Sequence, residues 1–435
     1  MEFYDRQREI RQIREWDRLA SGSAQMTVLV GRRRIGKTSL IRKALEQPSL
    51  YFFAAGKTEA LLCEEFIGAI KSGLGVDIPG EFRYFRDVFK YLLILSETRR
   101  FSLVIDEFQE FYTINSAVYS EMQNLWDTYK NSSKIHLVLC GSIYSLMTKI
   151  FENAKEPLFQ RANHRIMVKP LGIDFQKQIL SDYHPKYTNE DLLALYMASG
   201  GVPRYIELLM EAKAYTVKRI LDELLRENSF FLDEGKNVLI EEFGRDYTTY
   251  FSILSLIASG KTSRSDIEGT LGQSVGPQLE RLEREFSLIK RAAPLFSKPG
   301  TRRIKYSIDD NFLNFWFRFI YKYRSAVEIG NLGYVRGILE RDYRSYAGRF
   351  LEKYFREKLI LSGEFSAIGP WWDKRTANEI DIVAVNDDKK HLLFAEVKLN
   401  PRELRLKELE LKAAPLLAGR QDYRAEFRGL SLRDM

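Results

Sequence analysis

Short apolar runs alternate with longer segments of helical periodicity over the first 170 residues. Residues 59–72, 84–98 and 116–130 repeat their apolar positions every three or four residues, so we expect helices there. Compact apolar runs, each expected to form a buried strand, lie at 27–30, 49–56, 103–106, 134–142 and 164–171. Strands that alternate with helices at this rhythm predict a parallel, three-layer α/β domain.

The middle of the chain has a different pattern. From Asp174 to Arg226 the periodicity is helical throughout, and Gly200, Gly201 and Pro203 end one helix and begin the next. Three short helices are then predicted at 250–259, 263–272 and 275–289, followed by strands at 287–294 and 302–308 around a Lys-Pro-Gly turn. Three helices followed by a basic hairpin are typical of a winged helix-turn-helix.

Aromatic residues at helical spacing mark the segment DDNFLNFWFRFIYKYRS, which we interpret as a packed connector. A final module begins near residue 345 with an amphipathic helix. Two apolar strands, 380–385 and 391–397, follow around a polar turn, and the stretch after Arg402 is predicted to be a charged helix.

A phosphate-binding motif lies between the first strand and the helical segment after it. Gly31, Gly36, Lys37 and Thr38 match G-x-x-x-x-G-K-[ST] in full. The backbone N–H groups of such a loop close around phosphate oxygens, Lys37 reaches the β- and γ-phosphates, and Thr38 supplies a hydroxyl to Mg²⁺. We therefore expect ATP to be bound by Gly31, Arg32, Arg33, Arg34, Ile35, Gly36, Lys37, Thr38 and Ser39.

Two adjacent carboxylates end the buried strand at 103–106. Asp106 is placed to meet the metal, and Glu107 to polarise the attacking water. Ser142 follows the strand expected between the two motif strands, where a hydroxyl can hold that water or sense the γ-phosphate. Arg161 is a candidate finger for a neighbouring subunit, although a solvated surface arginine is at least as consistent with the sequence. Arg204, at the start of a lid helix, is a candidate nucleotide contact.

Composition and charge add limits to this picture. The chain has 435 residues, of which 45% are hydrophobic, enough for two to four domains with sizeable cores. Apolar runs fall short of a membrane span, and the charged start does not resemble a signal peptide. The low number of cysteines, two, favours a reducing cytoplasm. The four histidines are scattered, which gives little support to a His-based metal site. The net charge of +8 favours anionic partners.

The segments GRRRIGKT, LVIDEF, CGS and GGVPRY occur in this order and resemble the AAA+-related ATPases of the archaeal/bacterial family that is allied to origin-recognition and STAND ATPases. The resemblance covers roughly the first half of the chain. It implies that Asp106, Glu107, Ser142 and the segment from Gly200 to Arg204 border the nucleotide.

The last module carries a second candidate site. Asp381 opens one strand, and Glu396 and Lys398, two residues apart on the next, face the same side of the sheet. The D-x(14)-E-x-K spacing after a helix with Glu352 resembles the PD-(D/E)XK nuclease superfamily. Asp381 and Glu396 could then hold a divalent cation, with Glu379 as an alternative to Asp381. A charged edge hairpin without catalysis is the simpler interpretation.

Together these patterns predict a P-loop ATPase core (1–172), a helical lid (173–230), a winged helix-turn-helix (245–310) and connector helices with a nuclease-like domain (311–435). The predicted function is a Mg²⁺-dependent ATPase whose nucleotide state controls a DNA-binding winged helix and the nuclease-like C-terminal domain, which we call the tail. DNA is expected to meet Arg281, Arg284, Arg302 and Arg303, and a homo-oligomer or a protein partner is possible. The alternatives are a STAND-type signalling ATPase or a transcription regulator with a catalytically inactive tail.

Overall fold

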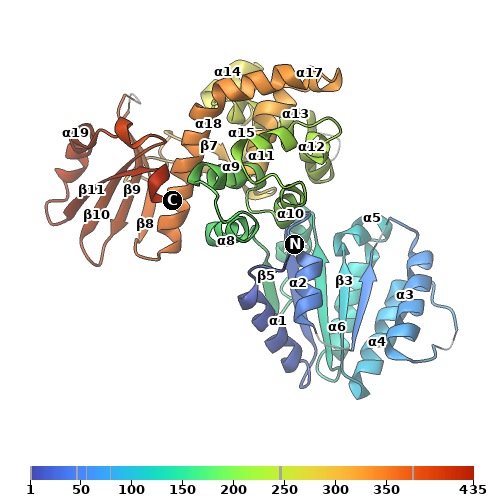
Figure 1. The fold of residues 1–435 in the computed structure, drawn as a ribbon. Helices are drawn as coiled ribbons and strands as arrows, with labels where there is room; N and C mark the ends of the chain where they lie inside the picture. Colours follow the sequence, from blue (N-terminus) through green and yellow to red (C-terminus); the bar gives the residue numbers. More distant parts are fainter. Residues whose placement is uncertain (1, 46–47, 55, 79, 244–246, 375–376) are drawn as a thin grey trace. The chain divides into compact units, whose positions relative to one another are not determined.

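The computed structural model describes residues 2–45, 48–54, 56–78, 80–243, 247–374 and 377–435. The chain forms two compact units, Phe3–Pro170 and Leu171–Met435 (Figure 1). We describe each unit by itself.

The first unit is built on a parallel sheet of five strands in the order β2-β3-β4-β1-β5. Its strands are β1 (Gln25–Val30), β2 (Ser49–Phe53), β3 (Phe101–Asp106), β4 (Ile135–Gly141) and β5 (His164–Met167). All residues of β1, β3 and β4 are buried, as expected for a sheet covered on both faces. β4 lies between the two motif strands, so this sequence prediction is confirmed.

Helices cover both faces of this sheet. They are α1 (Gln7–Leu19), α2 (Lys37–Ala44), α3 (Glu59–Leu74), α4 (Phe85–Thr98), α5 (Phe111–Ile114), α6 (Ala117–Tyr129) and α7 (Tyr144–Glu152). The even-numbered positions of β1 share a core with Phe66 of α3, Phe89 of α4 and Met122 of α6. The opposite face carries α1 and α2, which pack against each other.

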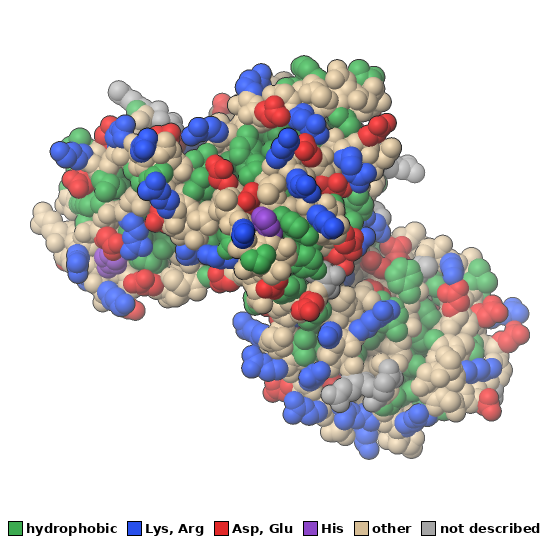
Figure 2. Space-filling model, viewed as in Figure 1, with side chains coloured by type: hydrophobic (Ala, Val, Ile, Leu, Met, Phe, Trp, Pro, Cys, Tyr) green, Lys and Arg blue, Asp and Glu red, His purple; other side chains and the backbone are tan. Residues whose placement is uncertain are grey.

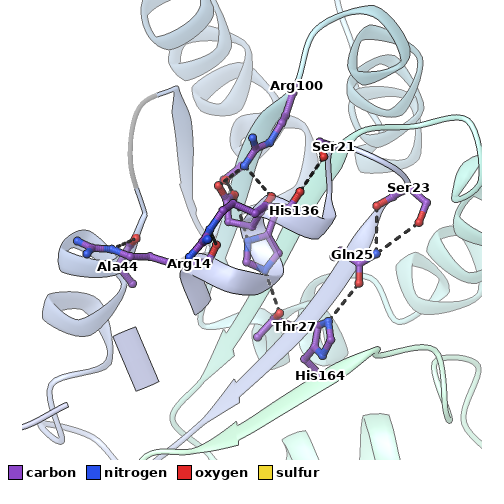
Figure 3. A network of polar contacts seen from close by, with 12 residues as sticks. Arg14, Ser21, Ser23, Gln25, Thr27, Ala44, Arg100, His136 and His164 are labelled. Carbon is purple, nitrogen blue, oxygen red and sulfur yellow. Dashed lines mark hydrogen bonds and ion pairs between the residues drawn. The ribbon is translucent and has the colours of Figure 1, made fainter. Parts of the chain in front are cut away.

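A polar network fastens α1 to the starts of the central strands (Figure 3). The fully buried His136 of β4 bonds Thr27 of β1 through Nε2 at 2.9 Å and Asp17 of α1 through Nδ1 at 3.3 Å. Asp17 also accepts hydrogen bonds from Ser102 and Arg100. Because parallel strands start at one edge and end at the other, this anchor lies at the edge opposite the phosphate loop. Leu19, the last residue of α1, is 52% exposed.

The second unit begins with a layer of helices. These are α8 (Ile173–Tyr183), α9 (Asn189–Ser199), α10 (Pro203–Glu211), α11 (Val217–Leu224) and α12 (Phe230–Phe243). The tight link between α9 and α10 places Gly200 and Gly201 at φ values of 56° and 78°. A Cβ on Gly201 would lie 2.2 Å from the carbonyl oxygen of Leu171, so only glycine fits there.

Three helices and a hairpin follow in the predicted order. They are α13 (Tyr247–Ala258), α14 (Arg264–Leu271), α15 (Gly276–Arg284), and the antiparallel strands β6 (Ile289–Ala292) and β7 (Lys305–Ile308). The aromatic segment forms α16 (Asn311–Phe315) and then wider and tighter helical turns up to Tyr323. Phe312, Phe315 and Phe319 are buried, which agrees with a packed connector. α17 (Arg324–Glu328) leads to the long α18 (Leu332–Leu361).

A four-stranded sheet ends the chain, in the order β11-β10-β9-β8. Its elements are β8 (Ala367–Trp372), β9 (Glu379–Asn386), β10 (His391–Lys398), α19 (Leu406–Leu417) and β11 (Arg424–Ser431). β9 pairs antiparallel with β8 and β10, whereas β11 runs parallel to β10 after the crossover through α19. The sequence predicted β9 and β10 but not β8 or β11, and it treated the end of the chain as helix alone.

Candidate nucleotide site

The phosphate loop joins the buried end of β1 to the first turn of α2. Arg34 and Gly36 have φ values of 67° and 88°, so the loop uses two left-handed residues to turn back toward the helix. The ammonium group of Lys37 is buried and donates to the carbonyl oxygens of Gly31 at 2.7 Å and Arg32 at 3.2 Å. Burial lowers the pKa of Lys37, against the charges of Glu107 and Asp106, which raise it.

The other residues expected at the loop differ in exposure. Ile35 is buried, Arg32 and Arg34 are partly exposed, and Arg33 and Ser39 are exposed.

Asp106 is buried at the end of β3 and faces Thr38 at the start of α2. Thr38 Oγ1 donates to Asp106 Oδ2 at 3.3 Å, and the backbone N–H of Glu107 donates to Oδ1 at 3.0 Å. A hydroxyl and a carboxylate are oxygen ligands of the kind that Mg²⁺ prefers, and this ion usually takes its other ligands from phosphates and water. Thr38 and Asp106 therefore fit a Mg²⁺ ion that enters with a nucleotide. Among the described residues, no group of three or more His, Cys, Asp or Glu side chains is arranged to hold a metal.

Glu107 is fixed by its neighbours. Its Oε2 atom accepts hydrogen bonds from Ser142 Oγ at 2.7 Å, Gln109 Nε2 at 2.7 Å and the backbone N–H of Ser142 at 3.3 Å. Glu107 itself has φ 52° and ψ 41°, a left-handed conformation that costs a non-glycine residue about 1–2 kcal/mol. The structure thus brings the predicted residues Glu107 and Ser142 into direct contact.

Three site residues were not singled out by sequence reasoning. Arg6 is buried, and its guanidinium donates to the carbonyl oxygens of Ile35 in the loop and Lys169 after β5. Tyr51 donates its phenol proton to Asp106 Oδ2. Gln109 follows Phe108 in the stretch FQEF, and an amide beside aromatic residues was the available signal for a buried polar role.

Arg161, the candidate finger, and Arg204, the candidate nucleotide contact, have other partners in the structure. Arg161 bonds Asp127 Oδ2 at 3.2 Å and the carbonyl oxygen of Phe159 at 2.9 Å, and it precedes β5 at the edge where the strands begin. Arg204 belongs to the second unit, where it pairs with Glu207 at 2.5 Å. Their predicted roles toward a nucleotide stay predictions.

The candidate nuclease residues meet at one end of the C-terminal sheet. Lys398 Nζ lies 3.9 Å from Asp381 Oδ2 and 3.8 Å from Glu396 Oε1. The backbone N–H of Val397 donates to Asp381, and that of Arg405 donates to Glu396. Burial, together with the charge of Asp381, raises the pKa of Glu352 on α18 to about 8. The alternative ligand Glu379 pairs with Lys305 instead, so Asp381 is the better candidate.

The hairpin between β6 and β7 is docked on this sheet. The backbone N–H of Leu295 donates to the carbonyl oxygen of Pro370, and Leu295 packs against the apolar core of the sheet. Arg303 donates to the carbonyl oxygen of Trp372 at 3.2 Å. Its predicted contact with DNA stays a prediction.

The other three predicted DNA contacts, Arg281, Arg284 and Arg302, are exposed. Arg281 pairs with Glu285 and lies over Phe286, and Arg284 pairs with Glu280. On the face in Figure 2, basic and acidic side chains are interspersed over the second unit. The net charge of +8 is therefore not gathered into one basic surface on this face.

The described part of the chain contains no helix with both the length and the apolar character needed to cross a bilayer. Both cysteines, Cys63 and Cys140, are buried thiols, and burial raises their pKa values, as expected of small core residues.

Comparisons with known proteins agree with the first half of this description. Residues 3–209 match the model of an ATPase domain found predominantly in Archaea. This match confirms the resemblance to archaeal ATPases. Residues 316–411 match a family described as archaeal and bacterial proteins of unknown function, so the nuclease resemblance stays a prediction.

Two individual proteins are similar over much of the chain. The uncharacterized protein MJECL04 of Methanocaldococcus jannaschii is 30% identical over 438 residues, which cover 97% of this chain and 93% of the relative. The Walker-type ATPase PABY2304 of Pyrococcus abyssi has a TM-score of 0.55 at 21% identity, over 72% of this chain and 96% of that one. The similarity to the P. abyssi structure shows a shared fold.

Proposed function

We propose a function from the premise that this chain belongs to the family of the M. jannaschii protein MJECL04 and carries an archaeal ATPase domain. The chain binds ATP with Mg²⁺ and hydrolyses it. The observation that carries this proposal is the convergence of Lys37, Thr38, Asp106, Glu107 and Ser142 at the edge where the parallel strands end.

Each of these residues has a task that its position supports. Lys37 exchanges its loop carbonyl partners for phosphate oxygens and stabilises the charge that develops during transfer. Thr38 and Asp106 hold the metal, which neutralises phosphate charge when bound. Glu107, aimed by Ser142, orients the attacking water and accepts its proton.

ATP turnover and nucleotide binding, measured separately, test these assignments. Lys37→Ala is expected to abolish binding or turnover, and Glu107→Gln to keep binding while it stops turnover. Lys43→Ala, on the exposed face of the same helix, is the matched control and should behave as wild type. Normal hydrolysis by the Glu107 variant would remove that residue from its role.

We further propose that the second unit is the effector, with α13–α15 and the β6–β7 hairpin as a winged helix-turn-helix that contacts DNA. Exposed Arg284 and Arg302 support this role, whereas the docked hairpin limits it. For the tail, the close approach of Lys398 to Asp381 and Glu396 supports a nuclease-like site.

A second candidate is a regulatory ATPase with an inactive tail, in the manner of STAND proteins. It is favoured by the backbone hydrogen bonds that already occupy Asp381 and Glu396. Plasmid nicking in Mg²⁺ or Mn²⁺ decides between the two. A working nuclease loses nicking in Asp381→Ala and Lys398→Ala but not in Lys389→Ala, whose side chain is 69% exposed. The absence of nicking by wild type would favour the regulatory function.

A further inference from the structure

The carboxylate of Asp106 is held on both of its oxygens. The backbone N–H of Glu107 donates to Oδ1, while Oδ2 accepts from Thr38 Oγ1 at 3.3 Å and from the phenol of Tyr51. Thr38 and Asp106 belong to the two nucleotide motifs. Tyr51 belongs to neither, and it comes from the edge strand β2.

Strand pairing explains how this tyrosine reaches the site. β2 runs parallel to β3 with Phe53 beside Asp106, so Tyr51 lies one strand repeat before the carboxylate. Leu50 and Phe52 enter the core on the side of α3 and α4, so Tyr51 projects to the opposite face, where α2 lies. There the guanidinium of Arg42, on α2, lies 6.0 Å from the centroid of the Tyr51 ring. The ring is thus packed under the helix that presents Thr38.

We propose that Tyr51 is the positioning residue for Asp106. Its phenol holds the carboxylate beside Thr38, so that both protein oxygens needed by the Mg²⁺ of the bound nucleotide are in place before the ion arrives. The inference rests on the proposed Mg²⁺-dependent ATPase. It adds a residue outside the motifs to the metal site.

The spacing of the two oxygens supports positioning. With Mg–O distances of about 2.1 Å in an octahedron, neighbouring ligand oxygens lie about 3.0 Å apart. The 3.3 Å between Thr38 Oγ1 and Asp106 Oδ2 is close to that separation and longer than the about 2.8 Å of a usual O–H···O hydrogen bond. The weak Thr38 contact can therefore give way to the ion, while Tyr51 keeps the other lone pair of Oδ2.

The competing interpretation is that the phenol obstructs the metal by occupying an oxygen that the ion needs. The two interpretations predict opposite signs. Loss of a hydrogen bond that orients a ligand carboxylate typically weakens metal binding 10- to 100-fold. Loss of an obstructing phenol would instead strengthen it.

The test is a Mg²⁺ titration of the binding of the non-hydrolysable analogue AMP-PNP by the full chain, with EDTA as the metal-free reference. Three proteins are compared: wild type, Tyr51→Phe, and Tyr91→Phe as the matched control. Tyr91, on α4, packs against Phe82. We expect all three to bind AMP-PNP equally in EDTA, and the Mg²⁺ midpoint to rise about tenfold in Tyr51→Phe alone. A Mn²⁺ titration followed by electron paramagnetic resonance should show the same shift.

A merely structural role of Tyr51 is separated by a double-mutant cycle. In an Asp106→Asn background, Tyr51→Phe should add no further shift of the midpoint, because the group that it positions is no longer a carboxylate. If Tyr51→Phe fails to fold, Tyr51→Met fills the same space without a donor and carries the same expectation.

The outcomes distinguish failure of the proposed Mg²⁺ dependence from failure of the role given to Tyr51. If AMP-PNP binding by wild type ignores Mg²⁺, the metal part of the proposed function is wrong. If wild type responds to Mg²⁺ and the midpoint of Tyr51→Phe is unchanged or lower, Tyr51 does not position Asp106, and the proposed ATPase stands.

Discussion

Replacing Gln109 by leucine should separate the stability of the ATPase unit from its activity. Gln109 is 2% exposed and gives one of the three hydrogen bonds that reach Glu107 Oε2. Its own carbonyl oxygen, Oε1, is buried and has no hydrogen-bond partner among the described residues. A buried polar atom without a partner costs about 1–3 kcal/mol, so the amide is kept at an expense to stability.

The magnitudes follow from these contacts. Gln109→Leu removes the unpaired oxygen and nearly preserves volume, so the thermal midpoint should stay the same or rise. The same change removes a hydrogen bond to a charged carboxylate, worth about 1.5–3 kcal/mol. If the two donors from Ser142 recover about half of that, the loss of about 0.8–1.5 kcal/mol lowers kcat about four- to twelvefold.

Steady-state ATP turnover and thermal unfolding, measured on the same preparation, form the assay. KM for ATP should change little, because Gln109 contacts the carboxylate of Glu107 and not the phosphate loop. Gln123→Leu, on the partly exposed face of α6, is the matched control. An unchanged kcat would show that Gln109 does not position Glu107. A raised kcat would show that it restrains Glu107 instead, and either result refutes the reasoning.

Two further predictions concern stability. Gly201→Ala should destabilise the second unit by about 3 kcal/mol or more, because the left-handed φ of 78° disfavours alanine and the Cβ would lie 2.2 Å from the Leu171 carbonyl oxygen. Chemical denaturation measures the loss, and Gly172→Ala, with open space where the Cβ would lie, is the control. Burial raises the pKa of Asp17, but hydrogen bonds from His136 and Ser102 and nearby positive charge outweigh this effect, so the net pKa is lowered. The stability that this anchor contributes is therefore present above about pH 3.9 and is lost as the pH falls through the pKa of the folded state. Asp17→Asn should therefore flatten the acid limb of stability against pH, and an unchanged limb would contradict the network as its source.

The sequence identified the residues at the nucleotide site whose position follows from chain direction. A parallel strand delivers its last residue to one edge of the sheet whatever its neighbours are. Asp106 ends such a strand and Lys37, Glu107 and Ser142 follow one, so their convergence could be predicted before any pairing was known.

Tyr51 could not be predicted in the same way. It lies inside β2, two residues before the strand ends, and its contact with Asp106 depends on which strand lies beside β2 and in which register. Neither the neighbouring strand nor the register can be derived from a single sequence. Gln109 is similar, since the left-handed turn at Glu107 decides where its amide points.

The tail shows a different limit. β8 contains Gly369 and Pro370, which weaken a strand pattern. β11 alternates the charged residues Arg424, Glu426 and Arg428 with Ala425, Phe427 and Gly429, a period-2 signal that was available and was not recognised. The central strands β9 and β10 are buried and were predicted, whereas the edges were not.

The docked hairpin changes what a DNA-binding role for the second unit would require. Leu295, Arg303 and Lys305 hold the hairpin on β8 and β9, and Lys305 pairs with Glu379, two residues before Asp381. The hairpin is therefore part of the support of the tail sheet. The exposed arginines of α15 and of the hairpin, Arg281, Arg284 and Arg302, remain the candidates for DNA contacts that keep this arrangement. A contact that pulled the hairpin away would break the Lys305–Glu379 ion pair at the start of β9. That pair lies two residues from Asp381, the carboxylate on which nuclease chemistry would depend.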